Sequence, residues 1–167
     1  TINSFGSDAV AGSAASLNFE YFSYFVVNAF AQTTVTFTSQ NYGAGKYDRC
    51  KKVFRLNMIF SLIFCGLLSS VFILGRGFFL HLYSNDPKVL TFAVQLIATA
   101  LELLTSTYEI SGGAMRGLGH SLSPALITVF GSCVLRLIWV STVCRCFHEF
   151  WVVMIIYPIS WVLTGSM

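Results

Sequence analysis

Four charged side chains fall inside long apolar segments of this 167-residue sequence. They are Glu20, Glu102, Glu109 and Arg136. A charge in the middle of a bilayer costs at least about 2.5–3 kcal/mol on insertion scales, so it needs a partner or a hydrated cavity. A carboxylate in such a place can hold a proton, a sodium ion or an organic cation, but hardly two at once. The glutamates are therefore candidates for exchanging one cation for another.

The segment that contains Glu102 carries the clearest pattern. Polar or small residues recur there at alternating spacings of four and three, at Gln95, Thr99, Glu102, Ser106, Glu109 and Gly113. This spacing places them on one face of a helix, with Thr105 close beside them. A polar stripe on a helix otherwise rich in Leu, Ile and Ala predicts a face toward the bundle interior or toward water. We expect Glu102 near mid-depth and Glu109 about two turns closer to the cytoplasm.

A similar but less regular pattern surrounds Glu20. The residues expected to share its helix face are Ser13, Ser16, Ser23 and Tyr24, with Asn28 and Gln32 beside them. A carboxylate on such a face either binds a cation or is hydrogen-bonded to a neighbouring helix, and both interpretations stay open for Glu20 and for Glu102. The candidate cation- and substrate-binding residues are Glu20, Tyr24, Glu102, Thr105 and Glu109.

Two charges have a structural interpretation that we favour. Glu109 is expected to reach the cytoplasmic interface or to pair with Arg116. Arg136 is expected to extend its side chain outward to the membrane surface, as long basic side chains do. An ion pair between Arg136 and a glutamate is the alternative.

The elements that must position these residues are apolar helices. Hydrophobic residues make up 55% of the chain and charged residues 10%, against about 25% charged in a soluble domain. The mean hydropathy is +0.71. Five apolar segments are long enough to cross a bilayer, which takes about 20 residues, and no two-residue alternation favours strands. They span 11–39, 53–74, 88–113, 122–143 and 150–167. The sequence predicts an all-α, polytopic transmembrane helix bundle with about four complete spans and a truncated fifth.

The distribution of basic residues predicts the orientation. Residues 40–55 and 113–121 contain most of the Lys and Arg, whereas the opposite loops contain Arg76, Lys88 and Arg145. Basic loops face the cytoplasm and are attracted to anionic lipid, so the lipid bilayer is an expected partner. No aromatic residues alternate with the basic ones as they do in single-strand binding surfaces, so we expect no nucleic acid.

The cysteines and histidines show no metal-binding arrangement. Cys65 and Cys133 lie in apolar runs, where a small buried side chain is the expected role. Cys144 and Cys146 are too close in sequence for an unstrained disulfide. The three histidines are far apart and form no ligand cluster with the cysteines. Because no nucleophile–base pair or phosphate loop is present either, we expect no metal, no cofactor and no enzyme activity.

Three motifs resemble those of the multidrug and toxic compound extrusion (MATE) family. QNYGAGKYDR at residues 40–49 is similar to the signature after the second helix of each half. AMRGLGHS at residues 114–121 is similar to the short loop between the fourth and fifth helices of a half. YPISW at residues 157–161 is similar to the start of the last helix. The resemblance extends over nearly the whole chain, from about residue 9.

The resemblance implies a protein of twelve helices in two lobes, of which residues 1–167 are a partial carboxy-terminal lobe. It implies export of organic cations in exchange for sodium ions or protons, a multi-pass location in the cell membrane, expected to be a bacterial inner membrane, and an amino-terminal lobe as partner. Some family members use an aspartate on the tenth helix. That position is Thr105 here, and Glu102, one turn away on nearly the same face, is expected to substitute for it.

Two other functions are compatible with parts of this pattern. A lipid-linked oligosaccharide flippase of the same superfamily would need a cationic cavity for its pyrophosphate, whereas three of the four intramembrane charges here are glutamates. A membrane receptor or scaffold could use the polar stripe only to hold helices together.

Overall fold

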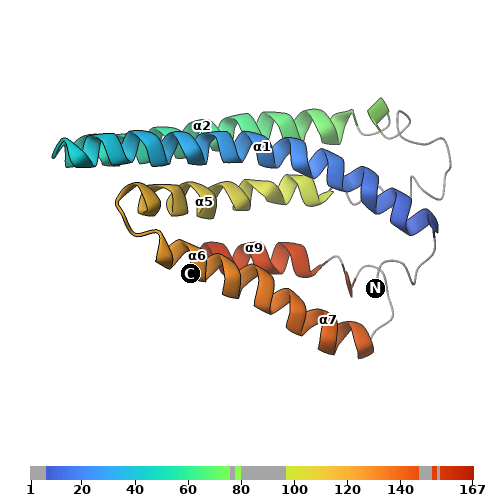
Figure 1. Ribbon diagram of the computed structural model, residues 1–167. Coiled ribbons are helices and arrows are strands. Elements are labelled where there is room, and N and C mark those ends of the chain that lie inside the picture. Colours follow the sequence, from blue (N-terminus) through green and yellow to red (C-terminus); the bar gives the residue numbers. More distant parts are fainter. Residues whose placement is uncertain (1–6, 76–77, 80–96, 147–151, 154) are drawn as a thin grey trace.

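The computed structural model describes residues 7–75, 78–79, 97–146, 152–153 and 155–167, with backbone alone at residues 97–102, 145–146 and several positions before Glu20 (Figure 1). Every element of the described part is a helix. The elements are α1 (Ser7–Gly43), α2 (Tyr47–Leu74), α5 (Ile97–Gly117), α6 (Leu122–Thr128), the π-helical segment η3 (Val129–Val134), α7 (Leu135–Cys146) and α9 (Ile156–Ser166). The expected all-α membrane bundle is confirmed.

The helices form two groups. Helices α1, α2 and α5 pack against one another, whereas α6, η3 and α7 form one continuous rod that runs obliquely to them (Figure 1). Helix α9 lies between the groups and contacts α5, η3 and α7. The turns that join α1 to α2 and α5 to α6 lie at the same end of the bundle. Both basic regions of the sequence are therefore at one end, as the orientation argument requires.

Within the described residues, two helical segments are long and apolar enough to cross a membrane by length and composition. They are Tyr47–Leu74 and Leu122–Cys144, with mean hydropathies of 2.2 and 1.9. Helices α1 and α5 have 37 and 21 residues and carry the glutamates that lower their apolar character. At 1.5 Å per residue, α1 is about 55 Å long, which exceeds the ~30 Å hydrocarbon core of a bilayer.

The helices extend beyond the expected apolar segments at the basic end. Helix α2 begins at Tyr47, so Arg49, Lys51 and Lys52 lie in its first two turns rather than in a loop. Lys and Arg are good helix formers, and their long side chains reach water from a helix that projects past the hydrocarbon. The expected helix starts near residues 88 and 150 lie outside the described residues.

Both turns at this end are closed by a glycine in the left-handed region. Gly45 has a φ of 69° and Gly119 a φ of 91°. In each turn the next residue donates its backbone N–H five residues back, from Lys46 to Asn41 O at 2.8 Å and from His120 to Met115 O at 2.9 Å. These are the bonds of a Schellman motif, which satisfies the free carbonyls of a helix end. The two family-like loop motifs therefore end their helices in the same way.

Small residues bring α1 and α5 into close contact. A Cβ on Gly113 would lie 2.8 Å from the carbonyl oxygen of Ala31, and one on Gly117 would lie 2.9 Å from that of Val35. Small residues allow such approach between membrane helices. The two contacts advance by one turn on both helices, so α1 and α5 run in the same direction. The face of α1 at this interface consists of fully buried residues at helical spacing, namely Ser23, Val27, Ala31, Thr34 and Thr38.

The rod from α6 to α7 contains a π-helical segment that the sequence pattern did not predict. A Cβ on Gly131 within it would collide with Thr164 Oγ1 of α9 and lie 3.2 Å from the Thr164 Cα. Ser132 is hydrogen-bonded to the same Thr164 hydroxyl at 3.4 Å. The segment therefore turns its small residues toward α9. Cys133, expected to be buried, is exposed on this segment, whereas Cys65 is fully buried as expected.

Candidate functional site

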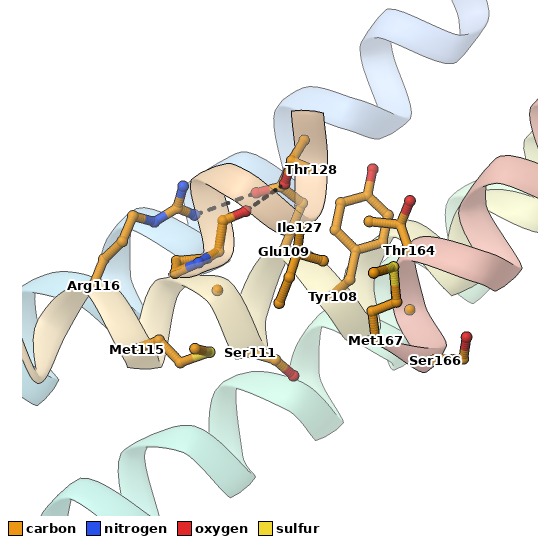
Figure 2. A pocket seen from close by; sticks show the side chains of 13 residues that line it. Tyr108, Glu109, Ser111, Met115, Arg116, Ile127, Thr128, Thr164, Ser166 and Met167 are labelled. Atoms are coloured by element: carbon orange, nitrogen blue, oxygen red, sulfur yellow. Dashed lines mark hydrogen bonds and ion pairs between the residues drawn. The ribbon is translucent and has the colours of Figure 1, made fainter. Parts of the chain in front are cut away.

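A cavity of about 370 Å³ lies between α5, α6 and α9, in the half of the bundle that contains the two turns (Figure 2). Ligand pockets for small molecules typically have volumes of about 300–1,000 Å³. Helix α5 contributes more of its lining residues than any other helix, and α6 and α9 provide further hydroxyl groups. The polar side chains around it are Tyr108, Glu109, Ser111, Arg116, Thr128, Thr164 and Ser166. One of the candidate acids, Glu109, is thus at a cavity.

Glu109 is held only loosely by Arg116. The Arg116 guanidinium donates to Glu109 Oε2 at 3.4 Å, and Figure 2 shows this contact as the dashed line that starts at Arg116. Charge-assisted N–H···O bonds are usually 2.7–2.9 Å long. The Arg116 side chain is 39% exposed and that of Glu109 18% exposed. Pairs with this exposure contribute about 0–1 kcal/mol. The expected pairing of Glu109 is confirmed, and it is weak enough for Arg116 to be displaced.

The hydroxyl groups of the cavity donate to the backbone of their own helices. Thr128 donates to Pro124 O at 2.9 Å, and Thr164 donates to Ser160 O at 2.7 Å. Ser111 donates to Thr107 O at 2.6 Å. A hydroxyl that has donated its hydrogen retains oxygen lone pairs as acceptors. Together with the Glu109 carboxylate, these oxygens give the cavity an acceptor-rich lining that suits a cation.

Tyr24 of α1 lies within electrostatic range of this acid. Its side chain is 37% exposed on α1, and both Glu109 and Arg116 interact with it electrostatically. Tyr24 does not line the cavity. The structure therefore brings together two of the five candidate residues, from helices that are distant in the sequence.

Glu20 lies elsewhere, in the half of α1 away from the turns. It is partly buried, and Arg136 of α7 lies within its electrostatic reach. Helices α1 and α5 are parallel, with Ala31 beside Gly113. Glu20 and Glu102 each lie about three turns before these residues, so they are level along the bundle. The side chain of Glu102 lies outside the described residues.

The expectation that Arg136 extends outward is wrong. Its guanidinium donates to Ser160 Oγ of α9 at 3.0 and 3.1 Å and lies 4.5 Å from the centre of the Tyr157 ring. Together these groups supply a hydrogen-bond acceptor and a cation–π contact. Because both partners stand on α9, Arg136 turns inward to that helix rather than outward to the membrane surface.

The polar stripe of α5 divides between packing and the cavity. Thr105 is 4% exposed, and Ser106 is fully buried and donates to Cys65 Sγ of α2 at 3.6 Å. Gly113 contacts α1, and Glu109 reaches the cavity. Most of the described stripe therefore faces the bundle interior as predicted, while Glu109 stands at its edge. Gln95 and the Thr99 side chain lie outside the described residues.

Several cavity residues carry no strong signal in the sequence. Thr128, Thr164 and Ser166 are single hydroxyl residues in apolar helices, a common pattern with mainly structural roles. What brings them together is the contact between α9 and the π-helical segment. Among the residues that the structure describes, no group of three or more His, Cys, Asp or Glu could hold a metal ion.

The sequence matches the MatE family over residues 1–142. The chain belongs to this family. A curated relative from Chromobacterium violaceum, named "Probable multidrug resistance protein NorM", is 26% identical over 126 residues, which are 74% of this chain and 27% of the relative. A relative of the same name from Thermotoga maritima is 24% identical over 135 residues, 79% of this chain and 29% of the relative. The chain thus matches less than a third of the length of these relatives.

Membership in the MatE family agrees with the resemblance seen in the loop motifs. Both motifs that end at a Schellman turn lie within the matched residues. Thr105, at the position where some members have an aspartate, is buried and does not line the cavity. The substitution of Glu102 for that aspartate stays a prediction.

Proposed function

We propose that this chain is part of a multidrug transporter that exports organic cations in exchange for sodium ions or protons by alternating access. The observation that supports this most strongly is the cavity beside Glu109, whose lining combines a loosely held carboxylate with hydroxyl oxygens. A cation that enters the cavity replaces Arg116 as the partner of the Glu109 carboxylate. The displaced guanidinium, already partly exposed, turns to water.

A single carboxylate is sufficient for exchange. Glu109 cannot be neutralised by an organic cation and by a proton or sodium ion at the same time, so loading one releases the other. Because the organic cation and the coupling ion bind at the same carboxylate, the transport of one is coupled to the transport of the other. In this proposal Glu109 is the acid nearest the cytoplasm, and Tyr24, outside the cavity, acts on it electrostatically rather than by touching the bound cation.

A second acidic level is proposed farther from the turns. Glu20 and Glu102 stand level on parallel helices, and Thr105 lies between that level and Glu109 on α5. A coupling ion released from one level can bind the other. Arg136, within electrostatic reach of Glu20, weakens cation binding there and so favours release.

Alternating access requires a second body against which this one moves. We therefore propose an amino-terminal lobe as partner, a multi-pass location in the cell membrane, and small organic cations as substrates. The chain's apolar exposed helices support the lipid bilayer as its solvent. No covalent step is needed, because the cargo changes side without changing its bonds.

The test is ethidium efflux from cells that produce the full-length protein. Glu109→Gln removes the charge and keeps the size, and we expect the efflux rate to fall at least about tenfold, since a charge-assisted contact is lost. Asp48→Asn is the matched control, because Asp48 is an exposed acid of α2 away from the cavity. Equal efflux by Glu109→Gln and the native protein, at equal protein levels in the membrane, would remove Glu109 from the mechanism.

Two further variants separate the acidic levels. Glu102→Gln is expected to abolish efflux if the second level couples the ion. Arg116→Gln leaves Glu109 without its competitor, so the half-saturating ethidium concentration should fall, by up to about fivefold for a weak surface pair. A rise in that concentration would mean that Arg116 positions Glu109 rather than competes for it. A scaffold without transport would give no efflux difference in any variant.

A further inference from the structure

A second surface feature lies on α2, at the end of the bundle that contains the turns. A groove of about 340 Å³ runs along one face of this helix and is lined by Lys51, Phe54, Arg55, Met58 and Ile59. Lys51 and Arg55 are one turn apart and Met58 and Ile59 follow one turn later, so basic groups stand at one end of the groove and apolar groups at the other. This arrangement is independent of the cavity at Glu109.

The two basic residues have no partner within the part of the chain that the structure describes. Neither Lys51 nor Arg55 forms an ion pair there, and both are exposed. The acid closest in sequence, Asp48, is also exposed and makes no ion pair with either of them. The groove therefore presents two uncompensated positive charges on adjacent turns.

The apolar end of the groove continues into an exposed apolar surface of α2. Ile59 is 47% exposed and Ile63, one turn further, is 50% exposed. Helix α2 is long and apolar enough to cross the membrane, and the face that adjoins the groove, with Ser61, Cys65 and Ser69, is buried in the bundle. The groove thus begins among exposed charges and ends at exposed apolar side chains of a helix that can cross the membrane.

We propose that this groove binds one anionic phospholipid. The phosphodiester oxygens accept hydrogen bonds from Lys51 and Arg55, and an acyl chain lies along Phe54, Met58 and Ile59. Basic pockets at the cytoplasmic ends of membrane helices suit such head groups. A free phosphate would use the cations and leave the apolar wall without a function. A zwitterionic lipid would bring an ammonium group to a surface that is already positive.

The experiment measures lipid binding to the full-length protein by native mass spectrometry in non-ionic detergent. Phosphatidylglycerol and phosphatidylcholine with the same acyl chains are titrated separately. The groove variant is Lys51→Gln with Arg55→Gln, and the matched control is Lys46→Gln with Arg49→Gln, which removes the same charge from the same end but lines no part of the groove. Thermal unfolding without added lipid verifies that both variants are folded.

We expect the native protein to bind phosphatidylglycerol with one saturable high-affinity site and phosphatidylcholine at least tenfold more weakly. The groove variant should lose about tenfold more affinity for phosphatidylglycerol than the control variant, as expected when charge-assisted bonds are removed. Met58→Gln, which keeps both cations, should also weaken binding, because the acyl chain loses apolar contact.

Three results would overturn the proposal. Equal losses in the groove and control variants would mean that general surface charge attracts the lipid. Equal binding of the two lipids would mean that the apolar face alone is responsible. Displacement of the lipid by soluble glycerophosphoglycerol at similar concentration would mean that the site recognises phosphate without an acyl chain.

Discussion

Helix α5 has two faces that are built differently. Toward α1, its glycines lie against backbone carbonyls, with Gly113 at Ala31 and Gly117 at Val35. Toward α6 and α9, the same helix borders a cavity of about 370 Å³ with Glu109 at its wall. Small residues without polar side chains allow contact without a gap, whereas a carboxylate and its solvation require space. One helix can therefore join a close-packed unit and line a binding site.

The difference extends to the contacts that hold each region. The α1–α5 contact depends on close backbone approach, which tolerates little change in volume. The contact between α9 and the rod of α6, η3 and α7 includes polar side chains, with Arg136 on Ser160 and Ser132 on Thr164. Side-chain contacts can rearrange by rotation, whereas backbone contacts cannot. We expect substitutions in the first region to be the more damaging.

The largest effect is expected for Gly113→Ala in the α1–α5 contact. The added Cβ would meet a carbonyl oxygen at 2.8 Å, and backbone cannot rotate away, so unfolding in detergent should require about 3 kcal/mol less free energy. Gly66→Ala on α2 is the control, because its Cβ meets Leu103 Cδ2 at an ordinary 3.9 Å. That variant should be neutral or more stable by up to about 1 kcal/mol. Similar stability of the two variants would contradict the proposed close packing.

An intermediate effect is expected for Gly131→Ala in the π-helical segment. Its Cβ would collide with the Thr164 hydroxyl, a side-chain group that can partly yield, so the loss should be about 1 kcal/mol. The double variant with Thr164→Ala removes the collision with the hydroxyl and leaves the close approach to the Cβ and Cα of residue 164, at 3.1 and 3.2 Å. Its loss should be smaller than the sum of the two single losses, as a double-mutant cycle measures. Additive losses would show that α9 does not contact this segment closely.

The smallest effect is expected for Ser106→Ala on the buried stripe of α5. The hydroxyl donates to Cys65 Sγ at 3.6 Å, and hydrogen bonds between membrane helices average about 0.6 kcal/mol. The unfolding free energy should fall by no more than this, and ethidium efflux should be unchanged. A tenfold loss of efflux in a stable Ser106→Ala protein would give the stripe a direct role in transport.

The sequence was sufficient for several features because they depend on neighbouring residues. The 3.6-residue periodicity identified the interior face of α5, and the pairing of Glu109 with Arg116 follows from two helical turns on one element. The Schellman turns at Gly45 and Gly119 fall within the two loop motifs seen in the sequence, although the helices continue closer to them than the apolar segments suggested. An apolar segment ends where the hydrocarbon ends, but the helix can continue beyond that point. Local composition could not indicate this continuation.

Other features required distant parts of the chain. The inward turn of Arg136 depends on Ser160 and Tyr157 of α9, and the exposure of Cys133 depends on which face of the π-helical segment meets Thr164. A single helix shows which residues share a face but not which neighbour covers it. The pattern within one segment therefore could not predict which helix packs against each face.

By itself the sequence determined an all-α membrane bundle, its basic end, and a set of acids that must avoid lipid, because hydrophobicity and charge act on each segment separately. Only the tertiary structure decided that Glu109 borders a cavity and that Ser106 is packed against α2. The two residues lie on the same stripe, less than one turn apart. Their surroundings differ because α2 and α1 close over one side of α5, while α6 and α9 leave space on the other.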